Sequence, residues 1–155
     1  MERAGTEVVE LEDGMSVLPL EMDPMVALVR PGHPLLACEH VTPADVAAYP
    51  VMLSSLPSME TYNSTRRDFF AAHGCRPRYR TRSAGTPAAL VKPGNESDEV
   101  TLVATSYSGS SSLVASHDAE IVEIAGTRAQ SCFCLCFPTH TPNKAVLALV
   151  EAMQG

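Results

Sequence analysis

The amino-acid sequence predicts an α/β fold with a mixed, largely parallel sheet flanked by helices. Short strand-like runs alternate along the chain with helix-like segments, which is the order that α/β proteins show. Several of these runs are apolar at consecutive positions, a pattern typical of strands that are covered on both faces. At 155 residues, the chain is long enough for a compact domain with a hydrophobic core.

Four helices are predicted from their start and stop signals. Three follow a Thr-Pro pair, in which the Thr hydroxyl caps the helix and Pro suits its first position. Asp45 lies three residues after Thr42 and predicts a capping box. The fourth helix begins after Ser58 and ends before Gly74. The predicted helices span residues 43–49, 59–72, 87–92 and 142–153.

Six strands are predicted from runs rich in apolar and β-branched residues. They span residues 25–29, 51–53, 79–82, 100–104, 121–124 and 132–137. The segment 92–99 is polar and turn-rich, and it is predicted to be a loop.

Charge and hydropathy exclude several classes of protein. The net charge of −7 argues against nucleic-acid binding by this chain as a whole, because neutralising phosphates requires a basic surface. No apolar run approaches the ~20 residues that span a bilayer, and the N-terminal segment has no signal-peptide core. We therefore expect a cytoplasmic protein without a membrane partner, whose five cysteines are reduced thiols.

Three cysteines alternate in the stretch CFCLCF, at positions 132, 134 and 136. On a strand their Cβ atoms would lie about 6.5–7 Å apart on one face. Thiolates that share a zinc ion must converge to about 2.3 Å from it, so an extended strand would have to buckle. The stretch therefore predicts a buried strand that uses Cys as a small apolar residue, with no metal and with slow thiol labelling.

Neither catalysis nor a cofactor is expected. The consecutive residues Ser116, His117 and Asp118 do not predict a catalytic triad, because triads are assembled from positions far apart in the sequence. The chain contains no G-x-S-x-G nucleophile motif and no Walker-type loop.

Arginines alternate between positions 76 and 82, so on a strand they would share one face. The favoured interpretation is a solvated edge strand that is protected by its charge. The alternative is contact with an anion or a protein partner, because Arg binds carboxylate and phosphate well.

Small hydroxyl residues follow three of the predicted strands, at residues 54–55, 83–86 and 105–112. In an open α/β sheet, the carboxyl ends of the strands form the ligand crevice. Hydroxyl groups and helix N-terminal N–H groups at that edge suit a carboxylate or another small anion. The alternative is that Ser and Thr are simply common in turns.

The stretch LEMDPMVALVRPGHPLLACEHVTPADVAAYPVMLSS resembles the effector-binding domain of LysR-type transcriptional regulators. It contains, in family order, the strand at 25–29, the GHPL turn at 32–35, the helix that includes Ala44 and Asp45, and the strand after Pro50. The later FFAAHGCRPRYR resembles the family's helix–Gly–x–Pro–strand unit. The resemblance covers residues from about 18 to 155.

The resemblance implies a type II periplasmic-binding-protein-like fold, in which two α/β lobes are joined by crossover strands. Residues 1–155 would form a single partial effector-binding domain. About 30–130 would be the second lobe, and about 18–30 and 131–155 would supply crossover strands and the C-terminal helix. The strand at 132–137 would return beside the strand at 25–29. The DNA-binding domain and most of the first lobe would have no counterpart in this chain.

The function implied by the resemblance is the sensing of a small-molecule effector, expected to be an anionic metabolite. Its effect would be transmitted to DNA only through a domain absent from this chain, and a homo-oligomer is expected. The alternative is an orphan protein-interaction or oligomerisation lobe that senses no ligand. The residues expected to hydrogen-bond the effector are Ser54, Ser55, Ser58, Gly85, Thr86 and Ser106.

Overall fold

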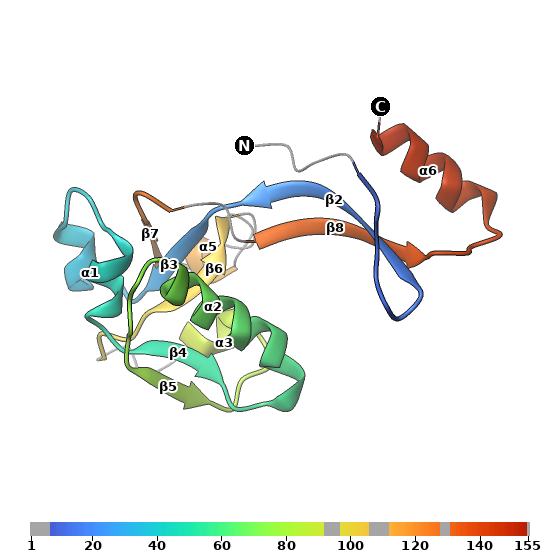
Figure 1. Ribbon diagram of the computed structural model, residues 1–155. Coiled ribbons are helices and arrows are strands. Elements are labelled where there is room, and N and C mark those ends of the chain that lie inside the picture. The colour runs from blue at the N-terminus through green and yellow to red at the C-terminus, as the bar shows by residue number, and fades with distance from the viewer. Residues whose placement is uncertain (1–6, 92–96, 106–111, 128–130, 155) are drawn as a thin grey trace. The chain divides into compact units, whose positions relative to one another are not determined.

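The computed structural model describes residues 7–91, 97–105, 112–127 and 131–154 (Figure 1). The chain divides into two compact units. Unit 1 contains Met1–Asp23 and Ser131–Gly155, and unit 2 contains Pro24–Gln130. No helix within the described ranges is long and apolar enough to cross a membrane.

Unit 2 is built on a mixed sheet. β3 lies between β6 and β7 and is antiparallel to both, whereas β4 and β5 pair in parallel. A parallel bridge between Val51 and Val100 joins β4 to the β6 side, which makes the order β5-β4-β6-β3-β7. Four strands therefore run in one direction and β3 in the other, which confirms the predicted mixed, largely parallel sheet. These strands are β3 (Met25–Val29), β4 (Val51–Ser54), β5 (Tyr79–Arg82), β6 (Thr101–Ala104) and β7 (Glu120–Glu123).

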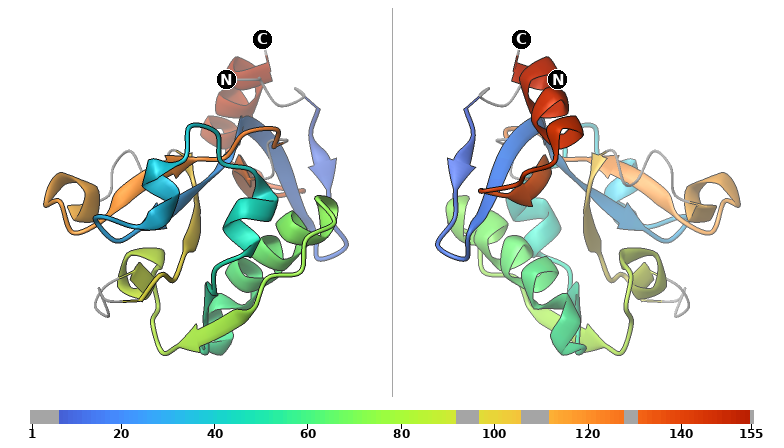
Figure 2. Two further views of the ribbon diagram at one scale, coloured as in Figure 1. Left: turned by 90° about the vertical axis from the view of Figure 1, so that its left-hand side faces the viewer. Right: turned by 90° about the vertical axis from the view of Figure 1, so that its right-hand side faces the viewer.

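Helices cover both faces of this sheet (Figure 2). On one face, Val46 and Phe70 pack with the strand residues Ala27, Val51 and Val122 in the main core. On the other face, two smaller clusters join the strands to the helices at Pro87–Val91 and Ser112–Ala115. The helices of unit 2 are η1 (Pro34–Ala37), α1 (Pro43–Ala47), η2 (Pro57–Met59), α2 (Glu60–Ala72), α3 (Pro87–Val91) and α5 (Ser112–Ala115).

The predicted capping box of α1 is present. The Thr42 hydroxyl accepts a hydrogen bond from the Asp45 N–H at 3.3 Å, and the Asp45 carboxylate accepts one from the Thr42 N–H at 2.8 Å. Hydrogen bonds from Thr42 hold the pKa of Asp45 below its usual value. The Thr42 N–H and hydroxyl both donate to the Asp45 carboxylate, and both bonds favour its ionised form at the helix N-terminus.

Unit 1 is an antiparallel sheet of β1 (Val9–Glu10), β2 (Met15–Asp23) and β8 (Ser131–Pro138), together with α6 (Lys144–Gln154). β8 pairs along its length with β2, with a register shift between Pro19 and Glu21. The prediction that the strand at 132–137 lies beside the strand at 25–29 is therefore wrong. Both sides of β3 are occupied by β6 and β7, so no edge of β3 is left to pair with β8.

Helix α6 begins later than its Thr-Pro pair predicts. The Asn143 side chain accepts a hydrogen bond from the Ala145 N–H at 3.0 Å, and the Thr141 hydroxyl accepts one from the Asn143 N–H at 3.2 Å. Asn therefore occupies the capping position, which it favours as strongly as Ser or Asp. From α6, Val150 packs against Leu18 and Phe137 of the sheet.

The expectation that the β8 thiols are buried is also wrong. Cys134 and Cys136 are exposed, whereas Phe137 is buried. Helix α6 covers the sheet face that carries Leu18 and Phe137, so alternation along the strand places the two thiols on the other face. The side chain of Cys132 lies outside the described set.

Candidate functional site

The carboxyl ends of β4, β5 and β6 lie along one edge of the unit 2 sheet, because these strands run in the same direction. β3 begins at this edge, since Met25 pairs with Ala104 at the end of β6. The Thr105 N–H donates to the Pro24 carbonyl oxygen at 3.1 Å, which ties the end of β6 to the start of β3. The predicted site residues that the structure describes lie at the end of β4 and in the segments that follow β4 and β5.

Ser54 is buried, with 3% of its surface exposed, at the end of β4. Its hydroxyl donates a hydrogen bond to the Ala84 carbonyl oxygen at 2.6 Å and accepts one from the Leu56 N–H at 3.1 Å. The hydroxyl donor of Ser54 is thus committed to the protein. Ser54 thus joins the loops after β4 and β5.

Asn63 supports the loop of the candidate site, and the sequence analysis did not identify it. It is buried on α2, where its side-chain oxygen accepts from the Ser54 N–H at 2.9 Å and its side-chain nitrogen donates to the Ser54 carbonyl oxygen at 2.8 Å. One sequence signal could have identified Asn63. It is a polar residue on the helix face that also carries Tyr62, Phe69 and Phe70.

Ser55, in the loop after β4, and Ser58, on η2, leave their side chains free just before α2. Both are exposed, and their hydroxyl groups make no hydrogen bond within the described part of the chain. The Ser55 N–H donates to the Arg82 carbonyl oxygen at 3.0 Å, which holds the loop against the end of β5. The N-cap residue of α2, Met59, makes no side-chain capping bond, so the positive end of the helix dipole is not capped by a side chain.

Gly85 and Thr86 form the second loop of the site, between β5 and α3. Thr86 is exposed, and its hydroxyl accepts a hydrogen bond from the Ala89 N–H at 3.2 Å, so that it caps α3. A side chain on Gly85 would approach Leu56 to 3.7 Å, which shows that this loop lies beside the loop after β4. The structure therefore brings together Ser54, Ser55, Gly85 and Thr86, and it places Ser58 on the adjoining η2. Ser106 lies outside the described residues.

A buried cation lies on the sheet side of α2. Arg66 donates through Nε to the Leu102 carbonyl oxygen at 3.1 Å, and its guanidinium carbon lies 3.8 Å from the centre of the Tyr62 ring. Burial lowers the pKa of Arg66, and the interaction with Tyr62 opposes that shift. Among the described residues, no carboxylate forms an ion pair with Arg66. Carbonyl oxygens and the Tyr62 ring, rather than a carboxylate, therefore stabilise the charge of Arg66.

The basic segment at 76–82 contains β5, which lies at the edge of the sheet and is largely exposed. Arg80 and Arg82 both form ion pairs with Glu99, each at 2.9 Å. Burial raises the pKa of Glu99. Hydrogen bonds from Arg80 and Ser97 and the charges of Arg82 and Arg80 outweigh that effect, so the pKa lies below its usual value. This arrangement agrees with the edge-strand interpretation.

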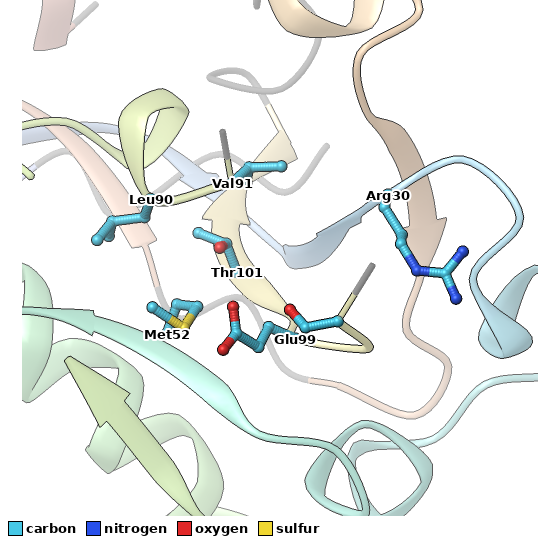
Figure 3. A pocket seen from close by; sticks show the side chains of 7 residues that line it. Arg30, Met52, Leu90, Val91, Glu99 and Thr101 are labelled. Atoms are coloured by element: carbon cyan, nitrogen blue, oxygen red, sulfur yellow. The ribbon is translucent and has the colours of Figure 1, made fainter. Parts of the chain in front are cut away.

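A small pocket lies away from the strand ends (Figure 3). Glu99 and Thr101 line it from the β6 side, and Met52 lines it from β4. No predicted site residue contributes to its lining, and the Glu99 carboxylate is already paired with two arginines. In the portion of the chain that the structure describes, no group of three or more His, Cys, Asp or Glu side chains is arranged to hold a metal ion.

Comparison with protein families gives one match over almost the whole chain. The family described as "LysR substrate binding domain" matches residues 4–155. No curated protein matches the sequence.

Solved structures with the same fold include three informative relatives. The effector-binding domain of QuiR in complex with shikimate is 19% identical, with a TM-score of 0.66, and the match covers 94% of this chain and 66% of that one. The BenM effector-binding domain with benzoate is 14% identical, with a TM-score of 0.72, and the match covers 95% of this chain and 65% of that one. Full-length CbnR with its target DNA is 14% identical, with a TM-score of 0.73, and the match covers 93% of this chain and 48% of that one.

These likenesses concern the fold, which in these relatives is type II periplasmic-binding-protein-like. The expected fold class is thereby confirmed. The chain spans about two thirds of the isolated effector-binding domains and about half of full-length CbnR.

Proposed function

Because the chain belongs to the family of LysR substrate binding domains, we propose that it binds a small anionic effector at the carboxyl ends of β4, β5 and β6. The ligand-contacting groups would be the hydroxyls of Ser55, Ser58 and Thr86, the backbone at Gly85 and, from the third loop, Ser106. Ser54 would hold the first two loops together.

The arrangement of the first two loops is the observation that carries this proposal. The Ser54 hydroxyl joins them at 2.6 Å, and the first loop leads through η2 to the start of α2, which has no side-chain cap. N–H groups at a helix N-terminus, together with exposed hydroxyl groups, suit a carboxylate. The ligands named for QuiR and BenM, shikimate and benzoate, are both carboxylates, which supports this class of effector.

The role of binding would be regulatory rather than catalytic, without a cofactor. An effector shifts a conformational equilibrium only if it binds the two conformations unequally. Binding at the strand ends would bias one conformation of a cytoplasmic, self-associating regulator and act on DNA through a part of the protein outside this chain. The family match favours this role over an interaction lobe without a ligand.

A thermal-shift screen tests the proposal, with shikimate, benzoate and other metabolite carboxylates as probes. We expect at least one carboxylate to raise the melting temperature of the chain, as mass action requires of a ligand that binds the folded state. We expect Ser55→Ala and Thr86→Val to reduce the shift. Ser64→Ala is the matched control, because Ser64 lies on α2 away from the strand ends.

Two results would count against the site. One is a carboxylate that stabilises wild type and both site variants equally. The other is an equal loss of the shift in Ser64→Ala.

A further inference from the structure

A pocket with a volume of about 370 Å³ lies at the end of unit 2 opposite the proposed effector site. Ala119 and Glu120 line it at the start of β7, and Pro31 lines it just after β3. Glu120 pairs with Val29 at the end of β3, whereas β3 begins at the edge that carries the proposed effector site. The length of β3 therefore separates the two places by roughly 13 Å.

Apolar side chains make up most of the exposed wall of this pocket. Val114 of α5 and Ile121 of β7 pack against the cluster of Val26, Leu28 and Val103, which holds the wall in place. Small-molecule sites are commonly apolar hollows of about 300–1,000 Å³ that contain few polar groups. The pocket therefore has the size and the lining of a small-ligand site. Its lining residues are Pro31, Val114, His117, Ala119, Glu120 and Ile121.

His117 and Glu120 are the two polar residues of this lining, and both are exposed. Within the described ranges, Glu120 forms no ion pair. Arg30, which precedes Pro31 in the chain, is paired with Asp98 at 2.6 Å. The Glu120 carboxylate therefore remains available to a cationic ligand.

The backbone at His117 lies in the left-handed region, with a φ of 60°. It ends α5 in a Schellman motif: the His117 N–H donates to the Val114 carbonyl oxygen at 3.2 Å, and the Asp118 N–H donates to the Leu113 carbonyl oxygen at 2.9 Å. Histidine tolerates this conformation better than most residues, but glycine adopts it without steric cost. The helix end therefore does not require an imidazole, whereas the pocket gains a hydrogen-bonding group from it.

We propose that this pocket binds a small organic amine, in which an apolar body carries an ammonium group. The apolar body contacts Val114 and Ile121. The ammonium group donates to the Glu120 carboxylate and to the acceptor nitrogen of a neutral His117 imidazole. Charge selects this class of ligand, because a carboxylate attracts an ammonium group and repels an anion. The site is thus distinct in position and in charge preference from the proposed effector site.

Isothermal titration calorimetry of the full chain tests this site with two probes, 2-phenylethylamine and 2-phenylethanol. The probes are closely matched in size and shape, and only the amine carries a charge. We expect wild type to bind the amine with a dissociation constant of about 1 mM or below, as a ligand of this size allows. The alcohol is expected to bind at least about threefold more weakly, because it forms no ion pair.

Two substitutions separate the roles of the polar residues. Glu120→Gln is expected to remove the preference for the amine, because the amide carries no charge. Glu123→Gln is the matched control and should keep that preference, since Glu123 is exposed at the other end of β7 and does not line the pocket. His117→Gly is expected to weaken the binding of both probes by about threefold or more. It should melt at or above the wild-type temperature, because glycine relieves the strained backbone.

Any of three results overturns the inference. Wild type could show no saturable binding of the amine, or could bind it no better than the alcohol. Glu120→Gln could keep the preference for the amine, or Glu123→Gln could lose it to the same extent. His117→Gly could bind both probes as wild type does, which would leave the imidazole without a role in the pocket.

Discussion

At the scale of single residues, buried polar side chains determine the shape of the candidate site. Ser54 and Asn63 are each about 3% exposed, and they exchange hydrogen bonds at 2.8 and 2.9 Å. Satisfied in this way, the pair orients the loop after β4 without leaving an unpaired polar atom. The same loop then presents Ser55 and Ser58 to solvent. The buried residues hold the loop in place, and the exposed ones are the proposed contacts to the effector.

Replacing Asn63 with alanine tests this interpretation. The change leaves both the N–H and the carbonyl group of Ser54 without their side-chain partners in a buried site, which costs about 1–3 kcal/mol. We therefore expect the free energy of unfolding in urea to fall by about 2 kcal/mol. Ser64→Ala, on the same helix, is expected to change it by no more than about 0.5 kcal/mol. Equal losses in the two variants would contradict the proposed role of Asn63.

At the scale of elements, local signals located the helices and strands, and tertiary packing corrected their details. Thr42 and Thr86 cap their helices as predicted, whereas Asn143 caps α6 in place of Thr141. The apolar run of β3 signalled burial on both faces, which is correct, but it carried no information on strand direction. The hydrophobic pattern of a strand reports which of its faces are covered by other elements. The direction of the strand depends instead on the path that the chain takes between strands.

The ion pairs of Glu99 predict a pH dependence of stability. Its pKa is lower in the folded protein than in an unfolded chain, so its ion pairs stabilise the fold at neutral pH. This contribution is lost as the pH falls through the folded pKa. We therefore expect the stability difference between wild type and Glu99→Gln, measured by urea unfolding, to be larger at pH 7 than near pH 3. Asp68→Asn is the control, because Asp68 is exposed on α2 and forms no ion pair within the described structure.

The thiols of β8 predict a labelling pattern for the native protein. Cys134 and Cys136 are exposed, whereas Cys75 is partly buried and packs against the core of unit 2. We expect iodoacetamide to modify the first two faster than Cys75, because access limits the reaction of otherwise similar thiols. Peptide mapping by mass spectrometry measures the rates, with the exposed Cys38 as a positive control. Faster modification of Cys75 would contradict the exposure of the outer face of β8.

At the scale of the whole molecule, strand direction in unit 2 decides where the proposed effector site lies. The carboxyl ends of β4, β5 and β6 lie at one edge because these strands run in the same direction. β3 runs in the opposite direction and begins at this edge, where the Pro24 carbonyl oxygen accepts a hydrogen bond from the Thr105 N–H.

The sequence by itself determined the α/β class, the six predicted strands, the four helices and the family, because these depend on local propensity, capping and hydrophobic pattern. It also located the serine and threonine loops of the candidate site. Only the tertiary structure decided that β8 pairs with β2, that its cysteines face outward and that Asn63 holds Ser54. The physical reason is that strand partners and buried hydrogen bonds join residues far apart in the chain or on different elements. Which partners a strand or a buried polar group finds depends on the strand edges and sheet faces that the other elements leave uncovered.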